Sequence, residues 1–197
     1  MKIRTELIHF SEALQLECGE TLDSFDLMIE SYGELNESKS NAILVCHAFS
    51  GNHHVAGENK ELGIGWWDQI VGPKKAIDTD KYYVVCCNNL GGCAGSSGPT
   101  SINKKTGKVF GKDFPQVSVS DWVNSQKILM DKLEISSWHF VVGGSLGGMQ
   151  ALQWSIAYPN HIKKAGIFAA AAKSSTQNIA MNEVCLLYTS DAADDIP

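Results

Sequence analysis

The sequence contains very little arginine, few prolines and no long apolar run. Arg4 is the only arginine among 197 residues, and 22 acidic against 16 basic residues give a formal net charge of −6. With no basic stripe, the chain lacks the charge pattern of a protein that binds nucleic acid or an anionic membrane. No apolar stretch approaches the roughly 18 residues of a membrane span, and Met1 to Phe10 lack the apolar core of a signal peptide. We expect a cytoplasmic protein with no nucleic-acid or membrane partner.

The cysteines also lack a pattern, because no two of the six have the C-x-x-C spacing of a redox or zinc motif. Free thiols in a reducing compartment are the simplest interpretation. The composition, 44% hydrophobic with 18 glycines against 5 prolines, excludes a disordered or collagen-like chain. Its length suits one domain with a substantial core, which we place at residues 1–185.

Apolar runs and helical patterns alternate along the chain. Residues 5–10 and 25–32 are expected to form a first pair of strands. Four short, continuous apolar runs are typical of strands buried on both faces, at residues 42–46, 82–87, 140–142 and 167–169.

Helices are expected between these strands. One begins near residue 119 with Ser120 and Asp121 as its cap, and the other spans Leu146 to Tyr158 and stops at Pro159. This order predicts an α/β fold with a mostly parallel sheet and flanking helices. The glycine-rich stretch at residues 88–99 is expected to form a loop over the carboxyl edge of the sheet.

The last twelve residues, Leu186 to Pro197, differ from the rest of the chain. They include an acidic segment, Asp-Ala-Ala-Asp-Asp, and have no helical or strand period. We interpret residues 186–197 as a foreign or artefactual tail and leave them out of the fold prediction.

Gly143-Gly144-Ser145-Leu146-Gly147 is a G-x-S-x-G motif between a predicted strand and a predicted helix. This context indicates a nucleophile elbow, in which a sharp turn presents the serine hydroxyl at a helix N-terminus. Gly143 and Gly147 are expected to be needed for space. The alternative is a glycine-rich turn that binds a phosphate or only packs closely.

His47-Ala48-Phe49-Ser50-Gly51 follows an earlier predicted strand, where a second oxyanion donor is expected. We assign the two donors to the backbone N–H groups of Phe49 and Leu146. His47 is interpreted as a structural histidine that holds the loop, with a catalytic base as the alternative. His53 and His54, with Cys46 and His47, match no zinc spacing, so no metal site is expected. Cys93 is expected to be an inert thiol rather than a reactive one.

From about Phe25 to Val184 the chain resembles the homoserine O-acyltransferases, enzymes of methionine biosynthesis with an α/β-hydrolase fold. The resemblance rests on several blocks, of which Gly143-Gly-Ser-Leu-Gly-Gly-Met-Gln-Ala-Leu-Gln-Trp is the longest; others are His47-Ala-Phe-Ser-Gly, Gly65-Trp-Trp-Asp and Asn88-Asn-Leu-Gly-Gly-Cys. His53-His54-Val and Ser175-Thr-Gln-Asn resemble most the subgroup that often uses succinyl-CoA. Lys104 and Phe110 depart from the usual Pro and Tyr, in what we expect to be a surface loop.

The resemblance implies that Ser145 is the nucleophile and that the N–H groups of Phe49 and Leu146 form the oxyanion hole. Acetyl-CoA or succinyl-CoA is the implied co-substrate and L-homoserine the acceptor, with no permanently bound cofactor and no metal. The implied assembly is a homodimer. Rival functions are a serine O-acyltransferase, an esterase-type hydrolase and a non-catalytic remnant.

The family's triad Asp and His, a substrate-binding Arg and a helical lid come after the part that this chain matches. After Ser145 the sequence has one histidine, His161, and its only aspartates are Asp191, Asp194 and Asp195. The chain is therefore interpreted as an N-terminal fragment whose sheet is truncated after about the sixth strand, and which is inactive by itself.

Overall fold

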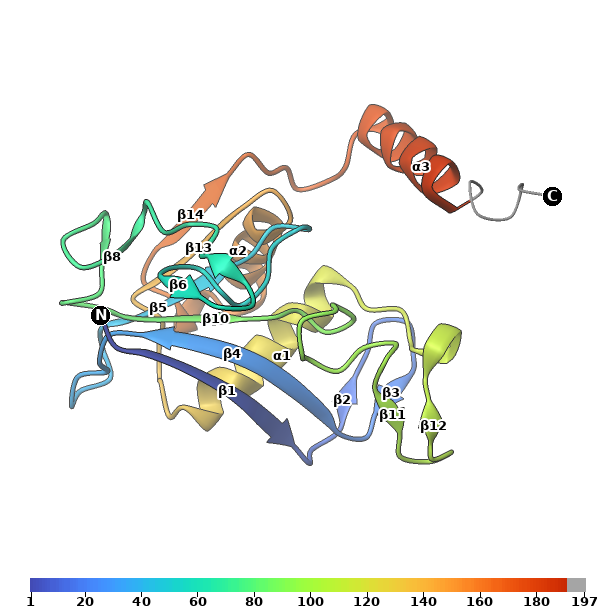
Figure 1. The fold of residues 1–197 in the computed structure, drawn as a ribbon, viewed down its shortest axis with the longest axis horizontal. Helices are drawn as coiled ribbons and strands as arrows, with labels where there is room; N and C mark the ends of the chain where they lie inside the picture. The colour runs from blue at the N-terminus through green and yellow to red at the C-terminus, as the bar shows by residue number, and fades with distance from the viewer. Residues whose placement is uncertain (191–197) are drawn as a thin grey trace.

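The computed structural model describes the backbone of residues 1–190 and the side chains of residues 1–185. Its centre is a six-stranded sheet (Figure 1). In spatial order the strands are β1 (Ile3–Phe10), β4 (Phe25–Tyr32), β10 (Tyr83–Cys87), β5 (Ala42–Cys46), β13 (Phe140–Gly144) and β14 (Ala165–Phe168). The first three pair antiparallel, and β10, β5, β13 and β14 run parallel. The predicted α/β fold with a mostly parallel sheet is confirmed.

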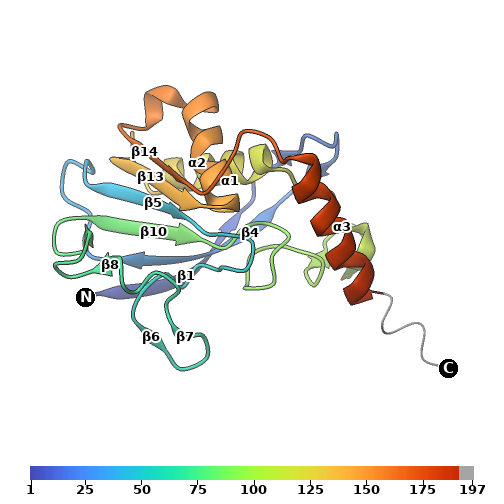
Figure 2. The ribbon, with the colours of Figure 1, turned by 90° about the horizontal axis from the view of Figure 1, so that it is seen from above.

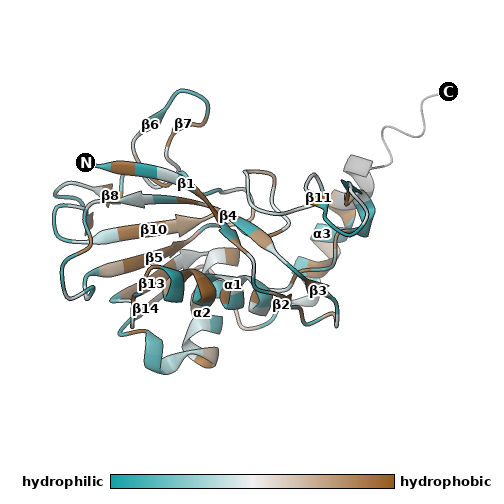
Figure 3. Cartoon of the chain, turned by 90° about the horizontal axis from the view of Figure 1, so that it is seen from below, coloured by the Kyte–Doolittle hydropathy of each residue, from teal (hydrophilic) through white to brown (hydrophobic). Residues whose placement is uncertain are grey.

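The apolar runs lie where the sequence placed them. Every residue of β5 and β10 is buried, as expected of strands covered on both faces. Figure 3 shows apolar residues concentrated on these inner strands. The last strand differs from its prediction, because β14 begins two residues earlier, at Ala165, and ends before Ala169, whose φ of 47° takes the chain out of the sheet.

Helices α1 (Val119–Lys132) and α2 (Leu146–Ala157) cover one face of the sheet (Figure 2). The largest hydrophobic cluster lies on this side and includes the fully buried Leu129, Trp138 and Trp154. Of the two residues predicted to cap α1, Asp121 takes part in the cap and Ser120 does not. Ser118 is the N-cap, and its side chain accepts from the Asp121 N–H while Asp121 accepts from the Ser118 N–H. Asp121 is therefore part of a capping box at the third helical position.

The opposite face is covered by the long connection from β5 to β10, residues 47–82, which contains no helix. Short strands shape it: β6 (Glu58–Asn59), β7 (Gly63–Ile64), β8 (Val71–Gly72) and β9 (Ile77–Asp78). Val55, Val71 and Ile77 from this connection pack on Ile43 and Val84 of the sheet in a second hydrophobic cluster. The sheet is thus covered by helices on one side and by this connection on the other (Figure 2).

Five short elements lie at the carboxyl side of the sheet or beyond it: β2 (Leu14–Gln15), β3 (Thr21–Leu22), β11 (Ile102–Asn103), β12 (Lys108–Val109) and the 3-10 turn η1 (Gly111–Asp113). The 3-10 turn η2 (Pro159–His161) lies at the opposite edge, where the His161 carbonyl accepts from the Trp138 N–H just before β13. A last helix, α3 (Thr176–Ser190), extends away from the sheet (Figures 1 and 2). Helix α3 extends to Ser190 and so enters the segment in which the sequence shows no helical period. Residues 191–197 lie outside the described part, and the proposed origin of residues 186–197 stays a prediction.

Within residues 1–190, none of the helices has the length and apolar character needed to cross a membrane.

Candidate active site

Ser145 occupies the turn between β13 and α2. Its backbone angles, φ 55° and ψ −121°, lie in a region that side-chain-bearing residues rarely adopt. The Ser145 N–H donates to the Phe168 carbonyl at 3.0 Å, which holds the turn against the end of β14. The Ser145 side chain is exposed and makes no hydrogen bond to any described residue. The predicted sharp turn at a helix N-terminus is confirmed, and it lies at the carboxyl edge of the sheet with a positive φ at Ser145.

The glycines on either side of Ser145 are required by space. A Cβ on Gly147 would lie 2.0 Å from the Cys46 carbonyl oxygen, and one on Gly143 would lie 2.3 Å from the Gly147 oxygen. Both contacts are with backbone atoms that cannot rotate away. The turn after β13 can therefore pack against the end of β5 only if positions 143 and 147 lack a side chain.

The loop that begins at His47 lies beside this turn. Strands β5 and β13 are parallel neighbours with Cys46 opposite Gly143, so the residues that follow each strand meet at one edge of the sheet. Phe49 and Leu146 line the same cavity, of about 570 Å³. Neither backbone N–H donates to an acceptor in the described part of the chain, and the Leu146 N–H is one of the free donors at the start of α2. Two unused donors are thus available beside Ser145.

His47 holds the two loops of this edge together. Its ring Nδ1 lies 2.7 Å from the Ala48 carbonyl oxygen, and its Nε2 accepts from the Asn89 N–H at 3.1 Å. One nitrogen donates and the other accepts, so the ring is in the neutral tautomer protonated at Nδ1. Burial lowers the pKa of His47, which keeps the ring neutral near pH 7. These contacts support the structural role and leave no ring nitrogen free to act as a base.

His161 lies at the opposite end of α2 from Ser145. Helix α2 has 12 residues between them, which corresponds to about 18 Å at 1.5 Å per residue. The His161 Nδ1 instead contacts the Ser136 carbonyl oxygen at 3.1 Å. His161 is therefore too far from Ser145 to take its proton.

The profile of the alpha/beta hydrolase fold family matches residues 41–183 of this chain. The match includes both loops at the edge described above. The chain belongs to the alpha/beta hydrolase fold family.

Individual proteins give a narrower resemblance. The chain is 59% identical to the homoserine O-succinyltransferase of Neisseria gonorrhoeae over 92% of this chain and 48% of that protein. A homoserine O-acetyltransferase structure from Bacillus anthracis superposes with a TM-score of 0.87 at 33% identity, over 98% of this chain and 54% of that one. Esterase E22 superposes with a TM-score of 0.84 at 38% identity, over 93% and 52%. The predicted resemblance to homoserine O-acyltransferases is confirmed, and the chain spans about half the length of the curated relatives it matches.

A series of buried hydrogen bonds, which we call the amide relay, runs from Trp154 through Gln126 and Gln150 and positions α2. The Trp154 Nε1 donates to Gln126 Oε1 at 2.7 Å, and Gln126 Nε2 donates to Gln150 Oε1 at 2.6 Å. Gln150 Nε2 then reaches the His47 carbonyl oxygen at 3.4 Å. The three side chains are fully buried, so this relay fixes α1, α2 and the His47 loop relative to one another.

A second buried network fixes the connection after β5 to the sheet. Glu30 of β4 accepts from Tyr32 and from Thr5 Oγ1 at 2.8 Å, and contacts His54 Nδ1 at 2.7 Å. The other ring nitrogen of His54 faces the Gly63 carbonyl oxygen at 3.1 Å. Burial raises the pKa of the Tyr32 phenol, which therefore remains protonated and donates to Glu30. His54 is thus paired with a carboxylate, and the described residues contain no group of three or more potential metal ligands.

The cysteines of the sheet are packed thiols. Burial raises the pKa of Cys87 to about 12 and raises the pKa values of Cys46 and Cys86 as well. Cys93 is exposed in the glycine-rich loop and lines the cavity that holds Phe49 and Leu146.

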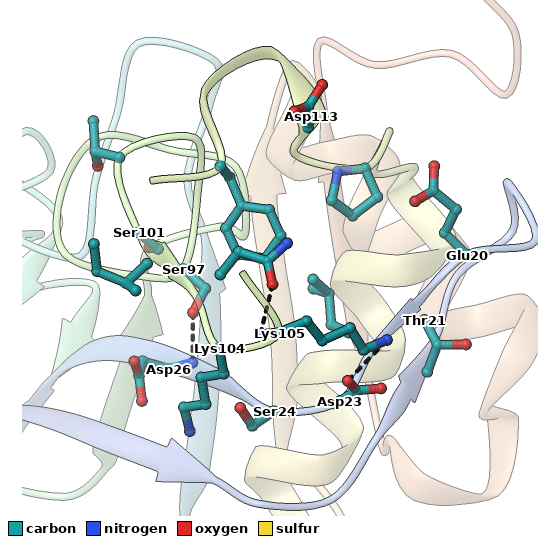
Figure 4. A pocket seen from close by; sticks show the side chains of 16 residues that line it. Glu20, Thr21, Asp23, Ser24, Asp26, Ser97, Ser101, Lys104, Lys105 and Asp113 are labelled. Carbon is teal, nitrogen blue, oxygen red and sulfur yellow. Dashed lines mark hydrogen bonds and ion pairs between the residues drawn. The ribbon is translucent and has the colours of Figure 1, made fainter. Parts of the chain in front are cut away.

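A larger cavity, of about 660 Å³, lies between the start of β4 and the β11–β12 hairpin (Figure 4). Figure 4 shows Lys105 of the hairpin pointing toward Asp23, at 3.0 Å, and Ser97 beside the Asp26 N–H. Neither Ser145 nor Leu146 lines this space. The smaller cavity is therefore the one that adjoins the candidate nucleophile.

Proposed function

We propose that this chain is the N-terminal part of a homoserine O-acyltransferase that transfers an acyl group from coenzyme A to L-homoserine. One observation carries the proposal: the strained serine of a hydrolase-fold elbow lies in a sequence 59% identical to a homoserine O-succinyltransferase. The amino acids at the elbow suit acyl transfer, because an exposed hydroxyl stands at a helix N-terminus beside two unused N–H donors.

In this mechanism the Ser145 Oγ attacks the thioester carbonyl of the acyl-CoA while its proton passes to a histidine base. The N–H groups of Leu146 and Phe49 donate to the oxyanion of the tetrahedral intermediate, and the CoA thiolate leaves with the proton from the histidine. The homoserine hydroxyl then attacks the acyl-serine and gives up its proton to the same base. The bond between the acyl carbon and Ser145 Oγ then breaks, the O-acylhomoserine leaves, and the histidine returns its proton to the Ser145 Oγ.

Each oxyanion donor typically contributes about 3 kcal/mol to lowering the barrier. The donors act best when their direction is fixed in advance. The His47 contacts to Ala48 and Asn89 and the Gln150 contact to the His47 carbonyl supply this rigidity.

We propose that the histidine base, its Asp partner and a lid that keeps water from the acyl-serine lie in the half of the relatives' sequence that this chain does not cover. Succinyl-CoA is the donor that the names of the relatives favour, and the acyl-CoA is a co-substrate rather than a resident cofactor. A cytoplasmic homodimer remains our expectation for the complete protein.

The test uses the complete protein. Its coding DNA is first sequenced beyond codon 185, and the full-length protein is then expressed. Mass spectrometry after mixing with succinyl-CoA or acetyl-CoA should find an acyl adduct on the peptide that contains Ser145. Ser145→Ala should lose the adduct and about 10⁴- to 10⁶-fold of the transfer rate, because nucleophile and base act as one unit. An adduct on Cys93 instead would mean that the nucleophile was wrongly assigned.

The acceptor decides between transfer and hydrolysis. CoA release that depends on homoserine identifies the transferase, and release without any acceptor identifies a hydrolase, the function named for esterase E22. Release that depends on serine instead would assign a serine O-acyltransferase, and no release at all would identify a non-catalytic remnant.

A further inference from the structure

The cavity beside the elbow has one charged group in a lining that is otherwise neutral. Apart from Lys112, the described residues that line it are apolar, glycine, amide or hydroxyl side chains, with Cys93 and the neutral His47. Lys112 lies on the wall formed by η1, and Leu146, with its free N–H, belongs to the same cavity. A cation in such a space attracts an anionic group of whatever molecule reaches Ser145.

The backbone around Lys112 is held in place. The Gly111 N–H donates to the Pro99 carbonyl at 2.8 Å, and the Phe110 N–H donates to the Ser101 carbonyl at 2.9 Å. The rings of Phe110 and Phe114, on either side of η1, meet edge to face with centroids 5.3 Å apart and pack on the hydrophobic core. The position of the lysine relative to the cavity is thus fixed by its neighbours, and its side chain is left free to turn toward a ligand.

Lys112 also lacks an acidic partner. Six other lysines form ion pairs within 4.0 Å in the structure: Lys2, Lys39, Lys75, Lys81, Lys105 and Lys127. Lys112 forms none with any described residue, although Asp113 is its neighbour in the chain. Asp113 instead lines the larger cavity on the other side of η1, where Glu20, Asp23 and Asp26 also lie. Lys104 and Lys105 line that larger cavity as well, so the turn separates a cavity of mixed charge from one whose single charged side chain is Lys112.

We propose that Lys112 binds an anionic group of the acyl donor when the thioester is placed at Ser145. This inference rests on the proposed function. Two anionic groups fit the chemistry: the terminal carboxylate of a succinyl group, or a phosphate of CoA. An ammonium donates equally well to both. A carboxylate at this point would make Lys112 a determinant of donor specificity, because an acetyl group has no charge for it to bind.

The experiment measures kcat/KM of the complete protein for succinyl-CoA and acetyl-CoA, in wild type, Lys112→Gln and Lys112→Arg. The matched control is Lys108→Gln, which removes the same charge from an exposed lysine on β12 that lines neither cavity. Lys112→Gln is expected to lower kcat/KM by about tenfold, the loss of one charge-assisted hydrogen bond. Lys112→Arg should retain most of the wild-type value, and Lys108→Gln should match wild type.

The two donors locate the anionic group. If Lys112→Gln lowers kcat/KM for succinyl-CoA and leaves that for acetyl-CoA unchanged, the bound group is the succinyl carboxylate. If it lowers kcat/KM equally for both donors, but not for the succinyl thioester of pantetheine, the bound group is a CoA phosphate. Two results overturn the inference while the proposed function stands, given that wild type transfers the acyl group. One is a Lys112→Gln variant with the wild-type kcat/KM for both donors. The other is a Lys108→Gln variant whose kcat/KM falls as much as that of Lys112→Gln. If wild type transfers from neither donor, the proposed function fails and this inference fails with it.

Discussion

Ser145 holds a backbone conformation that costs free energy. A residue other than glycine in a rarely populated region of φ and ψ is destabilised by about 1–3 kcal/mol, and persists only where its surroundings enforce it. Here the enforcing contacts are the hydrogen bond to Phe168, the start of α2 and the close approach of Gly147 to Cys46. The motif alone predicted this residue and its conformation, because the spacing of the glycines reflects the contacts that produce the strain.

At the scale of single residues, the sequence could not predict the partners of the histidines. His47 was expected to be structural, but its bond to Asn89 joins positions 42 residues apart in the chain. The Glu30 contacts of Tyr32 and His54 were not predicted at all. A sequence pattern reports periodicity and local turns, whereas these bonds depend on how the connection after β5 folds back over the sheet.

The neutral state of His47 makes stability depend on pH. Burial lowers its pKa below 6.5, so between pH 6.5 and that lower value the unfolded chain binds a proton that the folded chain does not. The free energy of unfolding should therefore fall as the pH decreases from 7 to 5. One such group contributes at most about 1.4 kcal/mol per pH unit. His53, whose pKa burial also lowers, acts in the same direction.

Urea unfolding of wild type and His47→Asn at pH 7, 6 and 5 checks this. The variant is expected to be less stable than wild type at pH 7, because the loop contacts are lost, but to show a smaller decrease on acidification. Equal decreases in the two proteins would show that His47 does not carry the effect. The carboxylates with lowered pKa values titrate below this window and affect both proteins alike.

At the scale of elements, the sequence predicted the central strands and two helices well, because their burial leaves a clear pattern. The strands of the sheet interior consist of continuous apolar runs, and α2 begins and ends at the glycine and proline signals. The cap of α1 was displaced by two residues, since Ser118, Ser120 and Asp121 all favour a helix start and only the geometry chooses between them. The two-residue strands β6 to β9 have no period long enough to detect.

The amide relay between α1 and α2 should be among the most costly buried contacts to break. Gln126→Leu removes the hydrogen bonds of Gln126 to Trp154 and Gln150 and leaves Trp154 Nε1 and Gln150 Oε1 buried without a partner. Each orphaned group costs about 1–3 kcal/mol, so a loss of about 2–5 kcal/mol in the free energy of unfolding is expected. Urea unfolding followed by tryptophan fluorescence measures it.

Gln153→Leu is the matched control for this variant. Gln153 is half-buried on α2 and forms no hydrogen bond to a described residue. Its replacement should change stability by about 0.5 kcal/mol or less. Similar losses for Gln126→Leu and Gln153→Leu would contradict a special role for the relay.

At the scale of the whole molecule, the described residues include the proposed nucleophile and its proposed oxyanion donors, but neither His47 nor His161 is placed to act as the base. His47 uses both ring nitrogens in the loop, and His161 lies at the far end of α2. We therefore predict that the 197-residue chain has no acyltransferase activity. A serine hydroxyl without a base is a poor nucleophile at neutral pH, and loss of triad members costs about 10⁴- to 10⁶-fold.

The measurement follows thiol release from acetyl-CoA and succinyl-CoA by the purified chain, with and without homoserine. No release above background is expected, and the complete protein serves as the positive control. Turnover that requires homoserine and disappears in Ser145→Ala would contradict the prediction, and would mean that His47 or His161 does take the serine proton.

Strand β10 lies between two strands that precede it in the chain, β4 and β5. During synthesis both of those apolar strands emerge before the strand that separates them in the sheet. The ribosome adds about 5–20 residues per second, so making residues 47–87 takes on the order of seconds, far longer than the microseconds in which neighbouring strands can form a hairpin. A direct β4–β5 pair is thus a competing state that β10 must later displace. This competing state can form before the serine of the elbow has been synthesised.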